Sequence, residues 1–160
     1  MEKNRKLLGI LGGLGPMATV YFYEMLTAHT KASCDQEHID ILISSRATTP
    51  DRTAFILGKS DESPIGAMIE EGKRLQECGA DLISLPCNTA HYFYDELTEA
   101  LDIPVVNILY ETAAHVKRTG AGTVGILATE GTVKSGAYAH VCQQVGLDCI
   151  VPDEVHQAIL

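Results

Sequence analysis

Short apolar runs alternate with longer amphipathic segments along the chain. The runs predict β-strands, at residues 7–11, 39–44, 81–85, 105–109, 123–128 and 148–151. The segments between them predict helices, at residues 16–31, 60–79, 89–100, 111–118, 133–145 and from 153 onward. Strands that alternate with helices are typical of a mostly parallel sheet with helices on both faces. We therefore expect an α/β protein.

Two of the predicted helices carry apolar residues at helical spacing, and an amphipathic helix turns such a face toward the core. In the helix at residues 16–31 this face consists of Met17, Tyr21, Met25 and Ala28. In the helix at residues 60–79 the expected core face consists of Ile65, Met68, Ile69 and Leu75.

A weak internal sequence similarity suggests that the chain forms two lobes. Residues 8–11 read LGIL and residues 124–127 read VGIL, and a Gly/Thr turn and a helix follow each. We therefore expect two pseudo-symmetric α/β lobes, the first at residues 1–105 and the second at residues 106–160. The second has too few predicted strands to bury a sheet of its own, so we expect it to be truncated.

The amino-acid composition and net charge limit the classes of partner that the chain can bind. The chain has 160 residues and a formal net charge of −9, which argues against nucleic acid or an anionic membrane surface as a partner. No apolar run is long enough to span a bilayer, and the charged first residues lack the apolar stretch of a signal peptide. The five cysteines have no paired spacing and are expected to be free thiols in a reducing compartment. We therefore expect a cytoplasmic protein.

Cys87 is the strongest candidate for chemistry, because it follows a short apolar run that stops at Pro86. Ligands of open α/β sheets bind outside the carboxyl ends of the strands. Thr89 could cap the following helix, and a helix N-terminus favours the reactive thiolate. The alternative for Cys87 is a small buried thiol. We interpret Cys34, Cys78, Cys142 and Cys149 as structural. His91 stands four residues after Cys87, but no further ligand falls at metal-site spacing.

The first glycine-rich turn fits a dinucleotide pattern. Residues 13–18 read GLGPMA after a predicted strand and before a predicted helix. The acidic residue expected at the end of the second strand is absent, and Arg46 nearby could instead meet a 2′-phosphate. We prefer a simple turn that brings backbone N–H groups near a small ligand.

Two other loops carry candidate binding groups. Arg52, next to Asp51, could hold a carboxylate through two hydrogen bonds, or the two could form a surface salt bridge. The turn from Thr129 to Thr132 offers hydroxyl and N–H groups to a carboxylate, or Thr132 simply caps the next helix. The two interpretations of this turn are compatible.

Four stretches together resemble the aspartate/glutamate racemase family, the cofactor-independent amino-acid racemases, and most closely its aspartate racemase branch. They are GILGGLGP at 9–16 with Ala18-Thr19, PDRTA at 50–54, PCNTAH at 86–91 and GILATEGT at 125–132. They occur in the order of the family and span nearly the whole chain.

The resemblance implies racemisation of aspartate or glutamate by two thiols on opposite faces of the α-carbon, without pyridoxal phosphate, another cofactor or a metal. Cys87 would be one of these thiols. The α-carboxylate and amino group would be held by Asn88, Thr89, Thr129 and Thr132. Arg52, oriented by Asp51, would meet a substrate carboxylate. Dimers are common in the family, so a homodimer is one expected assembly.

The sequence also departs from the family pattern. The second thiol belongs to a Gly-Cys-Thr-Glu motif that these 160 residues do not contain. Three alternatives therefore stay open. They are a related enzyme acting on maleate, a hydantoin or an arylmalonate, an NADP-binding oxidoreductase, and a non-catalytic binder of an acidic amino acid.

Overall fold

The computed structural model describes residues 5–159 of the chain. Its internal contacts divide the chain into two units. The first consists of Met1–Thr49, Ile65–Cys87 and Phe93–Val106, and the second of Pro50–Pro64, Asn88–Tyr92 and Asn107–Leu160. The predicted border at residues 105 and 106 stays a prediction about domains. The contact units change after Val106, and the second also takes in two earlier segments.

The first unit is a four-stranded parallel sheet in the order β2-β1-β3-β4. Its strands are β1 (Leu7–Gly12), β2 (Asp40–Ser45), β3 (Leu82–Ser84) and β4 (Val105–Val106). Its helices are α1 (Pro16–His29), a 3₁₀ turn at Asp35–Glu37, α3 (Ile65–Glu77) and α4 (Tyr94–Glu99). The register pairs Leu8 with both Ile41 and Leu82, so the carboxyl ends of these strands meet at one edge.

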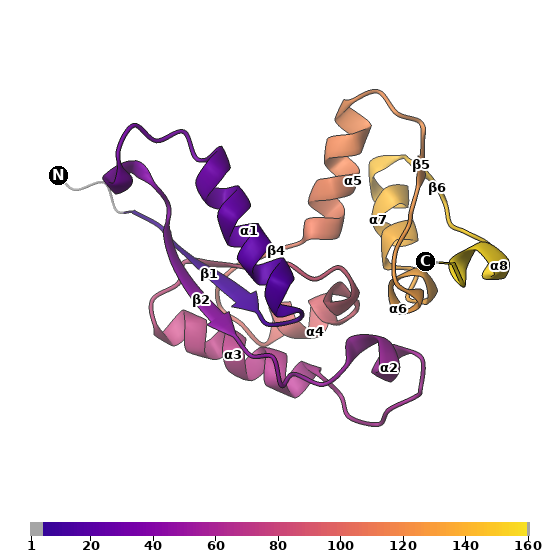
Figure 1. Cartoon of the computed structure of the whole chain (residues 1–160), viewed down its shortest axis with the longest axis horizontal. Coiled ribbons are helices and arrows are strands. Elements are labelled where there is room, and N and C mark those ends of the chain that lie inside the picture. Colours follow the sequence, from indigo (N-terminus) through magenta and orange to yellow (C-terminus); the bar gives the residue numbers. More distant parts are fainter. Residues whose placement is uncertain (1–4, 160) are drawn as a thin grey trace. The chain divides into compact units, whose positions relative to one another are not determined.

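Two glycines of β1 show how α1 and α3 cover opposite faces of this sheet (Figure 1). A Cβ at Gly9 would lie 3.3 Å from the Cβ of Leu75 on α3. A Cβ at Gly12, three residues along and therefore on the other face, would lie 2.5 Å from Thr19 on α1. The prediction of a parallel α/β protein with flanking helices is thus confirmed.

The expected core face of α1 is wrong. Met17 is 75% exposed and Tyr21 is 62% exposed, whereas the buried residue of this helix is Thr19. The reason is a hydrogen bond, because the Gly13 N–H donates to the Thr19 hydroxyl at 2.9 Å and turns that side of the helix toward β1. The spacing of hydrophobic residues in the sequence does not reveal this hydrogen bond of Thr19.

The expected core face of α3 is largely correct. Met68 and Leu75 are buried, while Ile65 and Ile69 are partly buried. Gly72 is buried as well, and a Cβ there would approach Leu101 to 2.9 Å.

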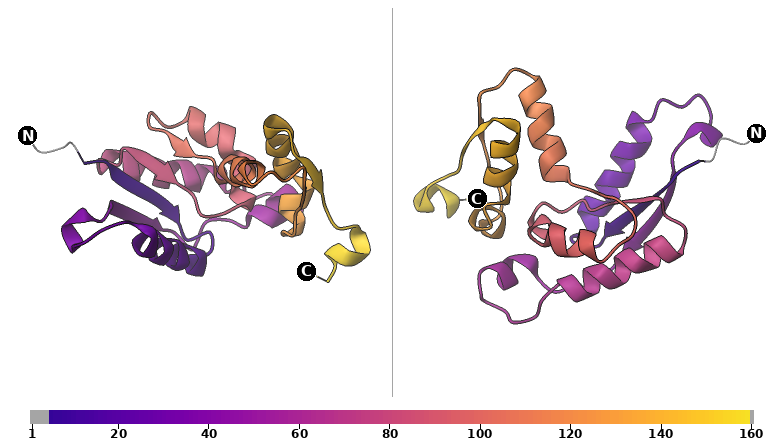
Figure 2. Two further views of the ribbon diagram at one scale, coloured as in Figure 1. Left: turned by 90° about the horizontal axis from the view of Figure 1, so that it is seen from above. Right: turned by 180° about the vertical axis from the view of Figure 1, so that it is seen from behind.

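The second unit is built on a parallel pair, β5 (Thr123–Gly125) and β6 (Asp148–Ile150). Its helices are α2 (Arg52–Ile56), α5 (Ile108–Arg118), α6 (Glu130–Lys134), α7 (Ala137–Val145) and α8 (Glu154–Gln157), and a 3₁₀ helix at Thr89–Phe93 begins in it. Figure 2 shows α5 and α7 side by side next to the two strands. Their core consists of Leu109, Ala113, Val141, Cys142 and Leu147.

Two of the predicted strands end three residues earlier than expected. The run at residues 105–109 stops at Val106, because the Asn107 side chain accepts the N–H groups of Leu109 and Tyr110 and begins α5 there. The run at residues 123–128 is a strand only to Gly125. Within residues 5–159, no helix is both long and apolar enough to cross a membrane.

Candidate functional site

Cys87 lies where the chain leaves the sheet of the first unit. It follows β3 after the buried Leu85, and its N–H donates to the Leu85 carbonyl at 2.8 Å. This turn ends the strand, and the cysteine is partly exposed. β1 ends at Gly12 on the same edge by register, so Cys87 follows the carboxyl end of a central strand, as the sequence predicted.

The other cysteines have two kinds of environment. Cys34 and Cys78 are exposed, whereas Cys142 lies in the core of the second unit beside the partly buried Cys149. Burial, and then the neighbouring Cys149, raise the pKa of the Cys142 thiol. A buried thiol with a raised pKa is a poor nucleophile near neutral pH.

Three threonine hydroxyls form a closed triangle in the second unit. The Oγ1 atoms of Thr89 and Thr132 are 2.7 Å apart, and each lies 3.0 Å from that of Thr129. Thr132 is buried. Each hydroxyl has one proton and can also accept, so the triangle can satisfy itself or turn protons toward a bound anion. All three residues were candidates from the sequence, and the structure brings them together.

The capping roles differ from those expected. Thr89 does not cap the following helix, since its hydroxyl bonds those of Thr129 and Thr132. The segment predicted as one helix at residues 89–100 begins as a 3₁₀ helix and becomes α4 only at Tyr94. At α6 the capping residue is Thr129, whose hydroxyl accepts the Thr132 N–H at 3.3 Å, and not Thr132.

Arg52 and Asp51 begin α2. The Asp51 side chain caps this helix by accepting the Ala54 N–H at 2.9 Å, and the Arg52 guanidinium donates to the Pro50 carbonyl at 2.9 Å. Asp51 thus caps the helix whose first residue is Arg52.

α2 lies directly against α6. A Cβ at Gly131 on α6 would stand 2.9 Å from the Thr53 Oγ1 and 3.0 Å from its Cα. Glycine at this position lets the backbone that carries Arg52 approach the backbone that carries Thr132. The second unit thus gathers three separate sequence motifs.

Asn88 has a partner that sequence reasoning missed. The Tyr138 hydroxyl donates to the Asn88 Oδ1 at 2.8 Å. Burial raises the pKa of Tyr138, so the phenol keeps its proton over a wider range. A tyrosine in the first turn of a helix carries no signal in the sequence that would have indicated this contact.

His91 and Arg46 have structural partners. His91 is buried, and its Nε2 accepts the Ile108 N–H at 3.2 Å. The Arg46 guanidinium lies 2.6 Å from Glu70 and 3.2 Å from Glu71. The hydrogen bond with Glu70 raises the pKa of Arg46 and lowers that of Glu70. Two neighbouring carboxylates do not suit the binding of a 2′-phosphate.

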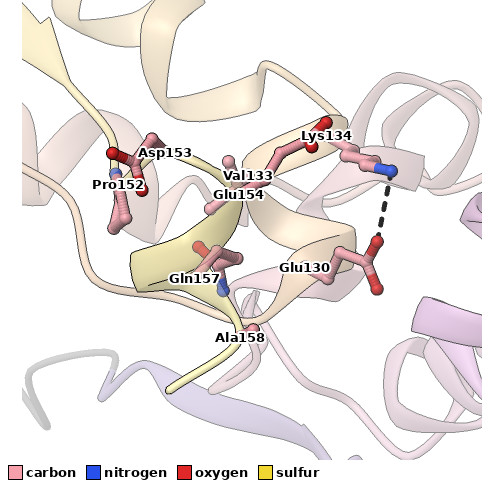
Figure 3. Close-up of a pocket in the computed structure, with 8 residues that line it drawn as sticks. All are labelled: Glu130, Val133, Lys134, Pro152, Asp153, Glu154, Gln157 and Ala158. Atoms are coloured by element: carbon pink, nitrogen blue, oxygen red, sulfur yellow. Dashed lines mark ion pairs between the residues drawn. The ribbon is translucent and has the colours of Figure 1, made fainter.

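A pocket of about 360 Å³ in the second unit has the wrong charge for an acidic ligand (Figure 3). It is lined by Glu130, Val133, Lys134, Pro152, Asp153, Glu154, Gln157 and Ala158. Glu130 pairs with Lys134 at 3.1 Å, and this hydrogen bond lowers the Glu130 pKa. The lining holds three carboxylates and one ammonium group, so it would repel an acidic amino acid.

No group of three or more His, Cys, Asp and Glu side chains is placed to hold a metal ion within the part of the chain that the structure describes.

Comparison with known proteins gives a consistent result. The family model described as Asp/Glu/Hydantoin racemase matches residues 11–159. The broad specificity amino-acid racemase RacX of Bacillus subtilis (strain 168) is 33% identical over 157 residues, which cover 96% of this chain and 67% of RacX. A glutamate racemase of Persephonella marina is 34% identical over 90 residues, 55% of this chain and 35% of that protein.

Solved structures agree. The Picrophilus torridus aspartate racemase superposes with a TM-score of 0.85 at 33% identity, covering 96% of this chain and 65% of that one. The putative Asp/Glu racemase of Yersinia pestis gives a TM-score of 0.81 at 26% identity, covering 96% and 67%. The fold is therefore the parallel α/β fold of these racemases. The chain belongs to the Asp/Glu/hydantoin racemase family, as its motifs indicated. It spans about two thirds of the length of RacX and of these two solved structures.

Proposed function

We propose that this chain acts in the cofactor-independent racemisation of an acidic amino acid, aspartate first, with Cys87 as the acid/base at the α-carbon. The observation that carries the proposal is the Cys87-Asn88-Thr89 sequence, in which a partly exposed thiol after a sheet strand is followed by a residue held in a hydroxyl triangle. Family membership and the aspartate and glutamate racemases among its relatives support it.

The chemistry assigns a separate task to each group. The Cys87 thiolate takes the α-proton and becomes a thiol, while the electron pair left on the α-carbon delocalises into the carboxylate. Hydroxyl protons of Thr89, Thr129 and Thr132 stabilise the charge that builds up there. The Arg52 guanidinium meets the side-chain carboxylate of the substrate. The closing step returns a proton to the α-carbon.

The face on which that proton arrives decides the product. Cys87 alone takes and returns the proton on one face, which exchanges the α-hydrogen with solvent without inverting the centre. Inversion needs a second acid on the opposite face, and the Gly-Cys-Thr-Glu motif of the resemblance is not part of the 160 residues. We therefore propose that Cys87 carries out the proton transfer on one face of the α-carbon, and that exchange of the α-proton of one enantiomer with solvent reports this half of the racemisation.

The test is proton NMR in D₂O with L-aspartate and D-aspartate supplied separately, together with chiral analysis of the product. We expect the α-proton signal of one enantiomer to disappear while its configuration is kept. Cys87→Ala should lower the exchange rate by at least about 100-fold, the range of general acid–base catalysis. Cys78→Ala, a change at an exposed cysteine, is the matched control. Equal exchange by the parent and the Cys87→Ala variant would refute the proposal.

The proposal also includes a cytoplasmic location and a homodimeric assembly. All five cysteines are free thiols, which fits a cytoplasmic protein. The small-molecule partner is an acidic amino acid, and a homodimer is the proposed assembly. Gel filtration with light scattering would measure the oligomeric state, and a mass of one chain would contradict the dimer.

A further inference from the structure

The Tyr138 side chain forms a hydrogen bond with the amide of Asn88. Its phenol donates to Oδ1 at 2.8 Å across 50 positions of sequence. Asn88 is exposed and directly follows Cys87. Without such a partner, an exposed amide rotates and exchanges its donor and acceptor ends.

The ring of Tyr138 is held in place by the packing of α7 in the core of the second unit. Tyr138 is partly buried in α7, and Val141 and Cys142, three and four residues further along, lie in the core of the second unit. Side chains at this spacing share one helix face. The base of Tyr138 is thus fixed by the core, and its polar tip reaches Asn88.

The direction of this hydrogen bond orients the amide. A phenol has one proton, and here it is given to Oδ1, so the Asn88 NH₂ group is turned to the other side of the amide. A tyrosine phenol carries its proton throughout the neutral range, and burial raises the pKa of Tyr138 further, against a smaller opposite effect of a hydrogen bond with Thr112. The neighbouring Thr89 is tethered in turn by Thr129 and Thr132. Both residues that follow Cys87 are therefore held through their side chains.

We infer that Tyr138 is a positioning residue, which holds the Asn88 amide so that its NH₂ group donates to the acidic amino acid. This inference rests on the function proposed above. Tyr138 acts through Asn88 and does not itself meet the substrate. Its removal should therefore weaken binding more than it slows the chemical step.

A double-mutant cycle tests this directly with Tyr138→Phe, Asn88→Ala and the double variant, using α-proton exchange in D₂O as the readout. Tyr138→Phe keeps the ring in the core and removes only the hydroxyl. We expect it to raise KM about threefold to tenfold, the range of one hydrogen bond, with kcat changed less than twofold. In the Asn88→Ala background the same change should have no effect, because the group it positions is gone.

Tyr110→Phe is the matched control, because Tyr110 is an exposed tyrosine on α5 of the same unit. Thermal unfolding monitors the fold of every variant. Nitrogen-15 NMR of the Asn88 side-chain amide gives a readout that does not depend on turnover, and its signals should move in Tyr138→Phe and stay in Tyr110→Phe.

Each other outcome has a defined meaning. An unchanged KM in Tyr138→Phe overturns the inference while the proposed function stands, and so does an equal loss in the parent and Asn88→Ala backgrounds, which would indicate a general structural role. A parent chain that exchanges neither enantiomer refutes the proposed function, and the substrate role of Tyr138 falls with it. Unmoved Asn88 amide signals in Tyr138→Phe would refute the contact itself.

Discussion

The hydroxyl oxygens of Thr89 and Thr132 lie 2.7 Å apart, although 43 residues separate them along the chain. This contact joins the segment after Cys87 to α6. Thr129 completes the triangle at 3.0 Å from each. Thr132 is the buried member of the triangle.

Thr132→Val tests this triangle with a change that keeps the shape of the side chain. It removes the Thr132 hydroxyl and leaves those of Thr89 and Thr129 bonded to each other, while the Thr132 N–H still donates to Thr129. We expect a loss of ~1 kcal/mol of unfolding free energy, the net value of a typical hydrogen bond, and weaker binding of aspartate. Urea denaturation and calorimetric titration measure the two effects.

The control for this change is Thr123→Val on β5, an exposed position in the same unit. It should leave aspartate binding unaltered. Full affinity in the Thr132→Val protein would show that the hydroxyl triangle does not hold the ligand.

Gly131→Ala should separate α2 from α6. The new methyl group would stand 2.9 Å from the Thr53 Oγ1 and 3.0 Å from its Cα, closer than real contacts allow. We expect a destabilisation of ~1–3 kcal/mol, as for other overpacked sites, and a higher KM because Arg52 neighbours Thr53. Gly122→Ala, which meets nothing within 4 Å, is the control. Equal unfolding free energies for the two variants would contradict the close contact.

The lowered pKa of Asp81 predicts a specific pH dependence of stability. Its carboxylate accepts hydrogen bonds from the Lys6 ammonium at 2.6 Å and the Leu7 N–H at 2.8 Å, and these lower its pKa. A carboxyl whose pKa is lower in the folded state adds stability that is complete above its unfolded pKa of about 4 and is lost as pH falls through the folded pKa. Asp81→Asn should therefore be less stable than the parent at pH 7.

The difference between the two proteins should shrink as pH falls from about 5 to 3. Urea denaturation across that range measures it, with Asp61→Asn at an exposed loop position as the control. A constant difference between Asp81→Asn and the parent at every pH would show that the Asp81 charge contributes no stability.

The strand pattern was sufficient to predict the parallel sheet, because buried strands such as β1 are nearly continuous apolar runs. It failed where a polar side chain decides the outcome. Thr19 sets the rotation of α1 through its bond to Gly13, and Asn107 ends a strand by starting α5. Hydrophobic spacing contains no information about either hydrogen bond.

In the candidate site, too, some features could be predicted from the sequence and others could not. Thr89, Thr129 and Thr132 could be selected from their motifs, but their mutual hydrogen bonds depend on contacts over some 40 positions that one sequence does not reveal. Tyr138 was missed for the same reason. The spatial partner of a surface amide is set by how α7 packs in the core, not by any residue near Asn88 in sequence.

The most direct test of the whole account is the α-proton exchange of aspartate in D₂O by the parent chain and by Cys87→Ser, which replaces the thiol with a hydroxyl of similar size that does not ionise near neutral pH. The account predicts that the parent exchanges the α-proton of one enantiomer and that Cys87→Ser loses this activity while it keeps its fold and still binds aspartate. Exchange of that enantiomer by the Cys87→Ser protein at the parent rate would contradict it.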